Sequence, residues 1–302
     1  MTGRPPGWLV ERPASWKVDG SLMMMVLVWG VTFVLVKRAL ADVSTLLFLT
    51  IRFGVAAFVL ALVFRKDFRA GKLGISIRGG VLAGLCLFGG YVFQTVGLRY
   101  TTASKAAFLT GFTTPMVAVL SSLVYRRAPQ WIEVLGVAVA FLGMALMTIP
   151  SGRFQIGGGD LIVAGCAVAY AFHILVTGRF ASEVNLGVFI VTQIATGAVV
   201  GAATFWSVEP VRIQWTLPLI VALAVTSLFA TALAFSIQTW AQRWTTPTRT
   251  ALIFAMEPVF AWITSYLLLG EVLSMRAAFG AAMILGGILM VELKPFRATS
   301  LP

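Results

Sequence analysis

The chain is poor in charge, in histidine and in cysteine. Charged residues make up 11% of its 302 residues, and only 11 are acidic against 23 that are basic. A soluble domain carries about 25% charged residues, so this composition excludes one. The single histidine and the two cysteines, Cys86 and Cys166, cannot supply a disulfide framework or a Cys/His metal site. We therefore predict no metal and no cofactor. No Gly-rich phosphate loop occurs either, which excludes an ATP-hydrolysing module.

Long apolar runs take up most of the sequence. Hydrophobic residues reach 59% and the mean hydropathy is +0.93. A spanning helix needs about 20 apolar residues, and lipid admits only helices or closed barrels because every backbone polar group must be bonded internally. The runs are too long and too uniformly apolar for barrel strands. The sequence predicts an all-α polytopic membrane protein with ten transmembrane helices, at about 20–39, 43–64, 78–98, 102–125, 131–150, 159–180, 185–206, 214–240, 247–270 and 274–293.

The net charge of +12 would also fit a nucleic-acid-binding protein, but the basic residues are distributed as in a membrane protein. With the N-terminus inside, fifteen of the 23 basic residues lie on the inner side, seven on the outer side, and Arg52 within a span. The positive-inside rule gives this bias for an N-in, C-in topology. We expect contact with the lipid bilayer, no nucleic-acid partner, and a multi-pass protein of the inner (plasma) membrane. Residues 1–19 and 294–302 are then cytoplasmic.

The sequence contains an internal repeat. The segment 94–102, QTVGLRYTT, returns as 238–246, QTWAQRWTT, at a constant offset of 144. The two repeats are predicted at 20–150 and 155–293, with five spans in each. An odd number of spans makes the second repeat enter the membrane from the opposite side, so the repeats are inverted, as in many transporters. Because one chain holds both repeats, we expect a monomer to be complete.

Five motifs in order resemble the EamA family of the drug/metabolite transporter superfamily, and the resemblance covers nearly the whole chain. The motifs are WGVTF at 29–33, LTIRF at 49–53, the segment 94–102 with its copy, MEPVF at 256–260 and LGE at 269–271. The resemblance implies ten helices with both ends inside and a central cavity lined mainly by spans 1, 3, 4, 6, 8 and 9. It also implies alternating access for small organic molecules, often amino acids or related metabolites, frequently moved outward.

An aromatic ring and an uncharged amide recur together in the two repeats. Gln94 follows Tyr91 by three residues and Gln238 follows Phe235 by three, a spacing that puts ring and amide on one helix face. Apolar, aromatic walls with few polar groups are typical of small-molecule sites. We predict that substrate contacts these four residues together with Trp29, Thr32, Tyr170 and His173. His173 either bonds substrate or relays protons, or is a satisfied histidine between helices.

Two charged side chains are expected near the membrane midplane. Charge there costs about 2.5–3.5 kcal/mol on insertion scales, so Arg52 and Glu257 need partners. Glu257 either couples transport to protons or binds a substrate ammonium, or it is a structural partner for Arg52 or for the broken backbone at Pro258. Pro115 and Pro258 are matched prolines within spans 4 and 9, where they interrupt the helix hydrogen bonds. We predict that they act in gating.

These features predict a secondary transporter that moves small amphipathic metabolites, amino acids or related compounds, across the inner membrane by alternating access, with export as the favoured direction. One alternative is an exporter of lipophilic drugs or cations coupled to protons through Glu257. Another is a membrane sensor or scaffold without transport. An enzyme is disfavoured, because one histidine and one clear intramembrane acid cannot form a metal cluster or an aspartyl dyad.

Overall fold

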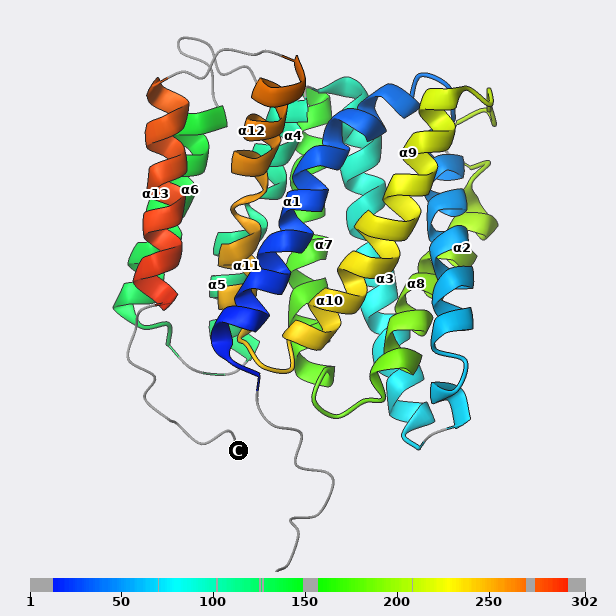
Figure 1. Cartoon of the computed structure of the whole chain (residues 1–302), viewed down its shortest axis with the longest axis horizontal. Helices are drawn as coiled ribbons and strands as arrows, with labels where there is room; N and C mark the ends of the chain where they lie inside the picture. Colours follow the sequence, from blue (N-terminus) through cyan, green and yellow to red (C-terminus); the bar gives the residue numbers. More distant parts are fainter. Residues whose placement is uncertain are drawn as a thin grey trace, which may run out of the picture.

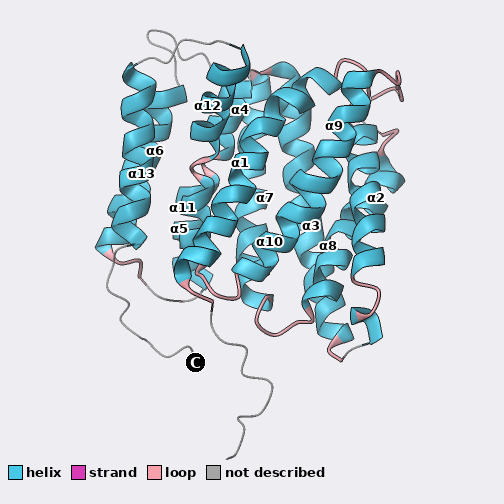
Figure 2. Cartoon of the chain, viewed as in Figure 1, coloured by secondary structure: helices cyan, strands magenta, loops and turns pink. Residues whose placement is uncertain are grey.

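The computed structural model describes residues 13–69, 71–101, 103–124, 126, 128–148, 157–207, 209–269 and 275–292. Most of the predicted cytoplasmic ends, 1–12 and 294–302, lies outside these residues. Figure 2 shows that the described chain is built of helices joined by short loops. The only strand-like pairing within it is an isolated antiparallel bridge between Val43 and Ile213. The predicted all-α class is therefore confirmed.

The helices follow the apolar runs closely. In chain order they are α1 (Ser15–Ala39), α2 (Thr45–Val63), the 3-10 turn η1 (Asp67–Arg69), α3 (Leu73–Tyr100), α4 (Ala103–Thr110), α5 (Thr113–Val124), α6 (Trp131–Thr148), α7 (Gly158–Phe180), α8 (Leu186–Thr204), α9 (Leu217–Ser227), the π-helix η2 (Leu228–Leu233), α10 (Ala234–Ala241), α11 (Pro247–Phe254), α12 (Glu257–Leu269) and α13 (Met275–Glu292). α1 begins at Ser15, earlier than the predicted start at residue 20.

Seven helical stretches of the described residues are long and apolar enough to cross a membrane. They are α1, α2, α3, Ala106–Val124, α7, α8 and the α9–η2–α10 stretch Leu217–Ala241. Two shorter apolar helical stretches, Trp131–Leu146 and Met275–Met290, add to them. The multi-pass membrane fold is thus established, whereas ten crossings with both ends inside remain a prediction. The start of α1 and the end of α13 do lie at the same edge of the molecule, as that topology requires (Figure 1).

The helices pack into one bundle with a central group and two flanks. α3 packs along α7 and α8, and α2 packs along α8, on one side of α1 (Figure 1). α6 and α13 form a pair on the opposite side. The backbones of that pair come close: a Cβ added to Gly143 would lie 2.5 Å from the carbonyl oxygen of Gly280, and one added to Gly287 would lie 2.4 Å from that of Gly136. Only glycine permits this approach, a recurring device between helices in lipid.

The fourth span of each repeat is broken at an equivalent position. α4 ends at Thr110 and α5 starts at Thr113, while α11 ends at Phe254 and α12 starts at Glu257, both at the repeat offset of 144. Pro115 and Pro258 lie in the first turns of α5 and α12, where a missing N–H costs no helix bond.

Candidate functional site

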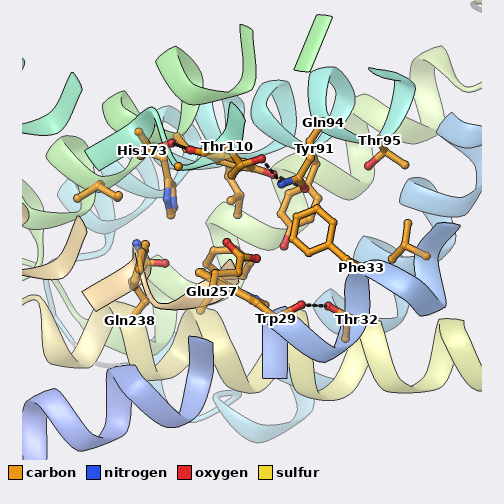
Figure 3. Close-up of a pocket in the computed structure, with 18 of the residues that line it drawn as sticks. Trp29, Thr32, Phe33, Tyr91, Gln94, Thr95, Thr110, His173, Gln238 and Glu257 are labelled. Atoms are coloured by element: carbon orange, nitrogen blue, oxygen red, sulfur yellow. Dashed lines mark hydrogen bonds between the residues drawn. The ribbon is translucent and has the colours of Figure 1, made fainter. Parts of the chain in front are cut away.

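A cavity lies in the centre of the bundle. About 810 Å³ of space here is not filled by protein atoms, and part of it is open to solvent. Its wall is formed by Trp29, Thr32, Phe33, Val36, Arg52, Leu87, Tyr91, Gln94, Thr95, Leu98, Thr110, Gly111, Thr113, Thr114, Tyr170, His173, Ile174, Phe235, Gln238, Phe254 and Glu257. All eight residues predicted to contact substrate are among them, as are Arg52 and Glu257. Pro115 and Pro258 are not. Figure 3 labels Trp29, Thr32, Tyr91, Gln94, His173, Gln238 and Glu257 of this set.

Aromatic rings form one continuous part of the wall. The Trp29 ring centroid lies 5.4 Å from that of Phe235 and 5.1 Å from that of Phe254. Tyr91 continues the series, 6.2 Å from Phe235 and 5.7 Å from Tyr170. These tilted and edge-to-face pairs fix one another's orientation, each at a gain of about 0.5–1.5 kcal/mol beyond burial. The wall is therefore rigid as well as apolar.

Gln94 has protein partners at both ends of its amide. Its Nε2 donates to the Thr110 hydroxyl at 3.0 Å, and its Oε1 accepts from the Tyr170 hydroxyl at 3.1 Å. Thr110 in turn donates to the carbonyl oxygen of Ala106 at 2.8 Å. The amide thus joins α3, α4 and α7, and its sequence spacing from Tyr91 gave no sign of these partners.

Gln238, the repeat mate of Gln94, is bonded differently. Its Nε2 donates to Oε1 of Gln242 at 3.1 Å, and Nε2 of Gln242 donates to the carbonyl oxygen of Ile174 at 2.9 Å. Oε1 of Gln238 is buried without a hydrogen-bond partner. The side chain as a whole is only 1% exposed. A buried acceptor left unpaired costs about 1–3 kcal/mol, so this oxygen is a place where a ligand would add stability.

His173 is buried in a chain of hydrogen bonds. Its Nε2 lies 3.1 Å from Oε1 of Gln193, whose Nε2 donates to the Thr239 hydroxyl at 3.1 Å. Since Thr239 itself donates to the carbonyl oxygen of Phe235 at 2.7 Å, the Gln193 amide is oriented with its oxygen towards the imidazole, and Nε2 of His173 carries the proton. This arrangement matches the prediction of a satisfied histidine between helices. The ring still lines the cavity and stacks edge-on against Phe235.

Arg52 finds its partners in spans 3 and 8. Its Nε donates to the Thr231 hydroxyl at 2.7 Å, and its Nη2 donates to the Tyr91 hydroxyl at 2.9 Å and to the carbonyl oxygen of Ala230 at 3.3 Å. The same carbonyl accepts from Nε1 of Trp29 at 2.9 Å. Ala230 and Thr231 lie in the π-helix η2, a rare local departure from the α-helix that is frequent at functional sites.

Glu257 lines the same cavity without pairing with Arg52. Among the described residues, no hydrogen bond or ion pair of its carboxylate is formed, so the predicted ion pair is absent from this conformation. Glu257 is the first residue of α12. A helix N-terminus carries a partial positive charge that favours a carboxylate, and this offsets part of the cost of placing one within the membrane.

Several cavity residues were not predicted from the sequence. Thr110, Thr113 and Thr114 come from the break between α4 and α5, and Phe254 ends α11 just before the second break. Thr110 and Thr113 donate to backbone oxygens nearby, and Thr114 donates to the carbonyl oxygen of Ala251 at 2.9 Å. The repeat could have identified Thr114. When Pro115 is aligned with Pro258, Thr114 occupies the position of Glu257 in the other repeat.

Sequence comparisons agree with this architecture. The EamA-like transporter family matches the chain twice, over residues 16–149 and 157–293. The chain belongs to the EamA-like transporter family. An uncharacterized transporter of Archaeoglobus fulgidus is 33% identical over 276 residues, covering 91% of this chain and 86% of that protein. The two matches also establish that this EamA protein is a duplicated transporter of the plasma membrane, and they confirm the resemblance found in the motifs.

Two further similarities concern substrate and fold. The S-adenosylmethionine/S-adenosylhomocysteine transporter of Chlamydia muridarum is 22% identical over 292 residues, with 89% of this chain and 90% of that protein covered. A solved crystal structure superposes with a TM-score of 0.76 at 18% identity, covering 95% of this EamA chain and 99% of the other. At that identity the structure shows a shared fold alone.

Proposed function

We propose that this EamA protein is a secondary transporter that moves small amphipathic metabolites, amino acids or related compounds, out of the cell by alternating access. The observation that carries the proposal is the central cavity, where a rigid aromatic wall holds a small number of polar groups: Gln94, His173, Gln238 and Glu257. Such a composition suits molecules with one apolar and one polar end. We assign no catalysis to the cavity, and we propose that one chain with its two repeats is sufficient for transport.

The relative from Chlamydia muridarum gives the proposal a chemical parallel. Its name assigns it S-adenosylmethionine and S-adenosylhomocysteine, which are amino-acid derivatives. Substrates of that class combine a charged amino-acid end with a larger body. The cavity of this chain offers polar groups at Gln238 and Glu257 and rings at Trp29, Phe235 and Phe254 for two such ends.

Proton-coupled export of cations is the second candidate, and Glu257 favours it. A carboxylate without a protein partner in a membrane cavity can take up a proton or a cationic substrate in turn. In either case the breaks before Pro115 and Pro258 supply bending points for the fourth span of each repeat. We propose these two positions as the gating elements.

Profiling of the culture medium tests the transport proposal. Cells that produce the parent protein should release a metabolite that cells producing the Gln94→Ala/Gln238→Ala double variant do not release. The variant must be shown to be folded in the membrane by its thermal unfolding curve. Equal release by a folded double variant would contradict the assignment of the cavity, and no release by either would favour import or a sensor role.

A further inference from the structure

Most polar groups that donate hydrogen bonds at the cavity wall already have protein acceptors. Nε1 of Trp29, Nε2 of Gln94 and the hydroxyl of Tyr170 all donate within the protein. Two acceptors differ from this pattern. Oε1 of Gln238 and the carboxylate of Glu257 receive no hydrogen bond from any described residue. A ligand that completes this wall therefore supplies donors.

The direction of the Gln238 amide is set by its neighbours. The carbonyl oxygen of Ile174 can only accept, so the amide group of Gln242 that faces it is Nε2. Oε1 of Gln242 then faces Gln238 and requires a donor, which is Nε2 of Gln238. Turning the Gln238 amide over would bring two oxygens together. Its Oε1 is thus held as the free end, in a side chain that is 1% exposed and lines the cavity.

Glu257 lies on the same side of the cavity. Figure 3 shows Gln238, Glu257 and Trp29 following one another along one part of the wall. Phe254 and Phe235 flank the Trp29 ring at 5.1 and 5.4 Å between ring centroids. Aromatic faces attract cations within about 6 Å of the ring centroid. One carboxyl group, one neutral amide oxygen and several rings together favour a positively charged group with several N–H donors.

Arg52 does not provide a matching site for an anion. A carboxylate is best held by two parallel N–H groups of a guanidinium. In Arg52, Nε and Nη2 already donate to Thr231, Tyr91 and Ala230, and only Nη1 has no acceptor among the described residues. The whole residue is 3% exposed. The cavity therefore offers two acceptors to a cation, and no guanidinium with two free nitrogens to a carboxylate.

We infer that Gln238 and Glu257 form an ammonium-binding subsite, and that this transporter selects its substrates by a protonated amine and not by a carboxylate. The inference rests on the proposed transport function and narrows its substrate class to primary amines, including amino acids and their amides. It places the ammonium between the Gln238 oxygen and the Glu257 carboxylate, with the apolar part of the substrate against the aromatic wall.

Thermal unfolding of the purified full-length protein tests the inference with matched ligands. L-phenylalanine amide keeps the ammonium and lacks the carboxylate, 3-phenylpropanoate keeps the carboxylate and lacks the ammonium, and L-phenylalanine has both. L-leucine amide and 4-methylpentanoate repeat the comparison with a smaller side chain. We expect both amides and the amino acid to raise the unfolding midpoint, and both acids to leave it unchanged.

Variants locate the effect at the subsite. Glu257→Gln and Gln238→Leu should each raise the amide concentration for half-maximal stabilisation about ten-fold, since each removes a hydrogen bond to a charged group. The surface changes Glu183→Gln and Gln130→Leu are the matched controls and should not alter it. If Glu257→Gln does not fold, Gln238→Leu is compared with Gln238→Glu, which keeps an acceptor and adds a negative charge. Gln238→Leu should raise the amide concentration for half-maximal stabilisation, and Gln238→Glu should not.

Three results would overturn the subsite. They are stabilisation by the acids equal to that by the amides, amide stabilisation unchanged in Gln238→Leu, and absence of stabilisation by every amine. Failure here is separable from failure of the transport proposal. Release of an anionic or uncharged metabolite in the medium-profiling experiment would leave transport standing and reject the ammonium subsite alone.

Discussion

Arg99 and Arg243 occupy equivalent positions in the two repeats and make equivalent bonds. Nη2 of Arg99 donates to the carbonyl oxygens of Leu40 and Val43, at 3.3 and 2.8 Å, in the loop between α1 and α2. Nε of Arg243 donates to the carbonyl oxygen of Ala181 at 2.6 Å, and Nη2 of Arg243 donates to the carbonyl oxygen of Val184 at 2.8 Å, in the loop between α7 and α8. The end of the third span thus fixes the first loop in both repeats. The relationship supports a duplicated origin beyond sequence similarity.

Arg243→Ala should destabilise the protein, because it leaves the carbonyl oxygens of Ala181 and Val184 without a donor. Hydrogen bonds to a charged group contribute roughly 1.5–3 kcal/mol when buried, and Arg243 is partly exposed, so we expect a loss of about 1–3 kcal/mol. The midpoint of thermal unfolding measures it. Arg179→Ala is the control, since it breaks only an exposed ion pair with Glu183 and should change little.

The ion pair between Asp19 and Arg249 joins the start of α1 to the start of α11. Charge reversal at either position should lower the unfolding midpoint, because two like charges then face each other in a partly buried place. The double reversal Asp19→Arg/Arg249→Asp should recover at least part of the loss, with a coupling energy of about 0.5–3 kcal/mol in a double-mutant cycle. Additive losses in the double variant would show that the two side chains do not depend on each other.

Gly287→Ala should be far more damaging than Gly286→Ala, although the residues are adjacent in α13. A Cβ on Gly287 would lie 2.4 Å from the carbonyl oxygen of Gly136, whereas one on Gly286 meets nothing within 4 Å. Overpacking of this kind costs about 1–3 kcal/mol, while alanine in an open helical position is neutral or stabilising. The two unfolding midpoints provide the comparison, and equal values would mean that α6 and α13 are packed less closely.

Arg52→Lys should destabilise the protein although the charge is kept. A lysine has one nitrogen and cannot reach Thr231, Tyr91 and the Ala230 carbonyl in the arrangement that the guanidinium holds. We expect a loss of about 1–3 kcal/mol. Thr231→Val should reproduce part of it, and Thr231→Ser, which keeps the hydroxyl, should not. Full stability of Arg52→Lys would show that charge alone is needed at this place.

Pro258→Ala should slow transport without lowering stability. Alanine restores a backbone N–H in the first turn of α12 and favours a helix that continues from α11, so the proposed bending point stiffens. Initial transport rates in proteoliposomes measure the effect. Pro218→Ala, in the first turn of α9 and away from the cavity, is the matched control. An unchanged rate in Pro258→Ala would remove this proline from gating.

The sequence by itself determined the class and the repeat, and it named candidate substrate-contacting residues. Apolar runs of spanning length leave helices as the only backbone solution in lipid. Spacing within a helix fixes which side chains share a face, so Tyr91 could be grouped with Gln94, and Phe235 with Gln238, before any packing was known. All eight predicted contact residues do lie there.

Only the tertiary structure decided what those residues bond to. An ion pair with Glu257 was one alternative for Arg52. The side chain bonds instead to Tyr91 of span 3 and to Ala230 and Thr231 in the π-helix of span 8, 178 and 179 residues away. Gln94 and Gln238 share a local sequence, yet Gln94 meets Thr110 and Tyr170 while Gln238 keeps a free oxygen. Local sequence fixes the face of a helix, and the neighbours packed against that face decide which hydrogen bonds are completed.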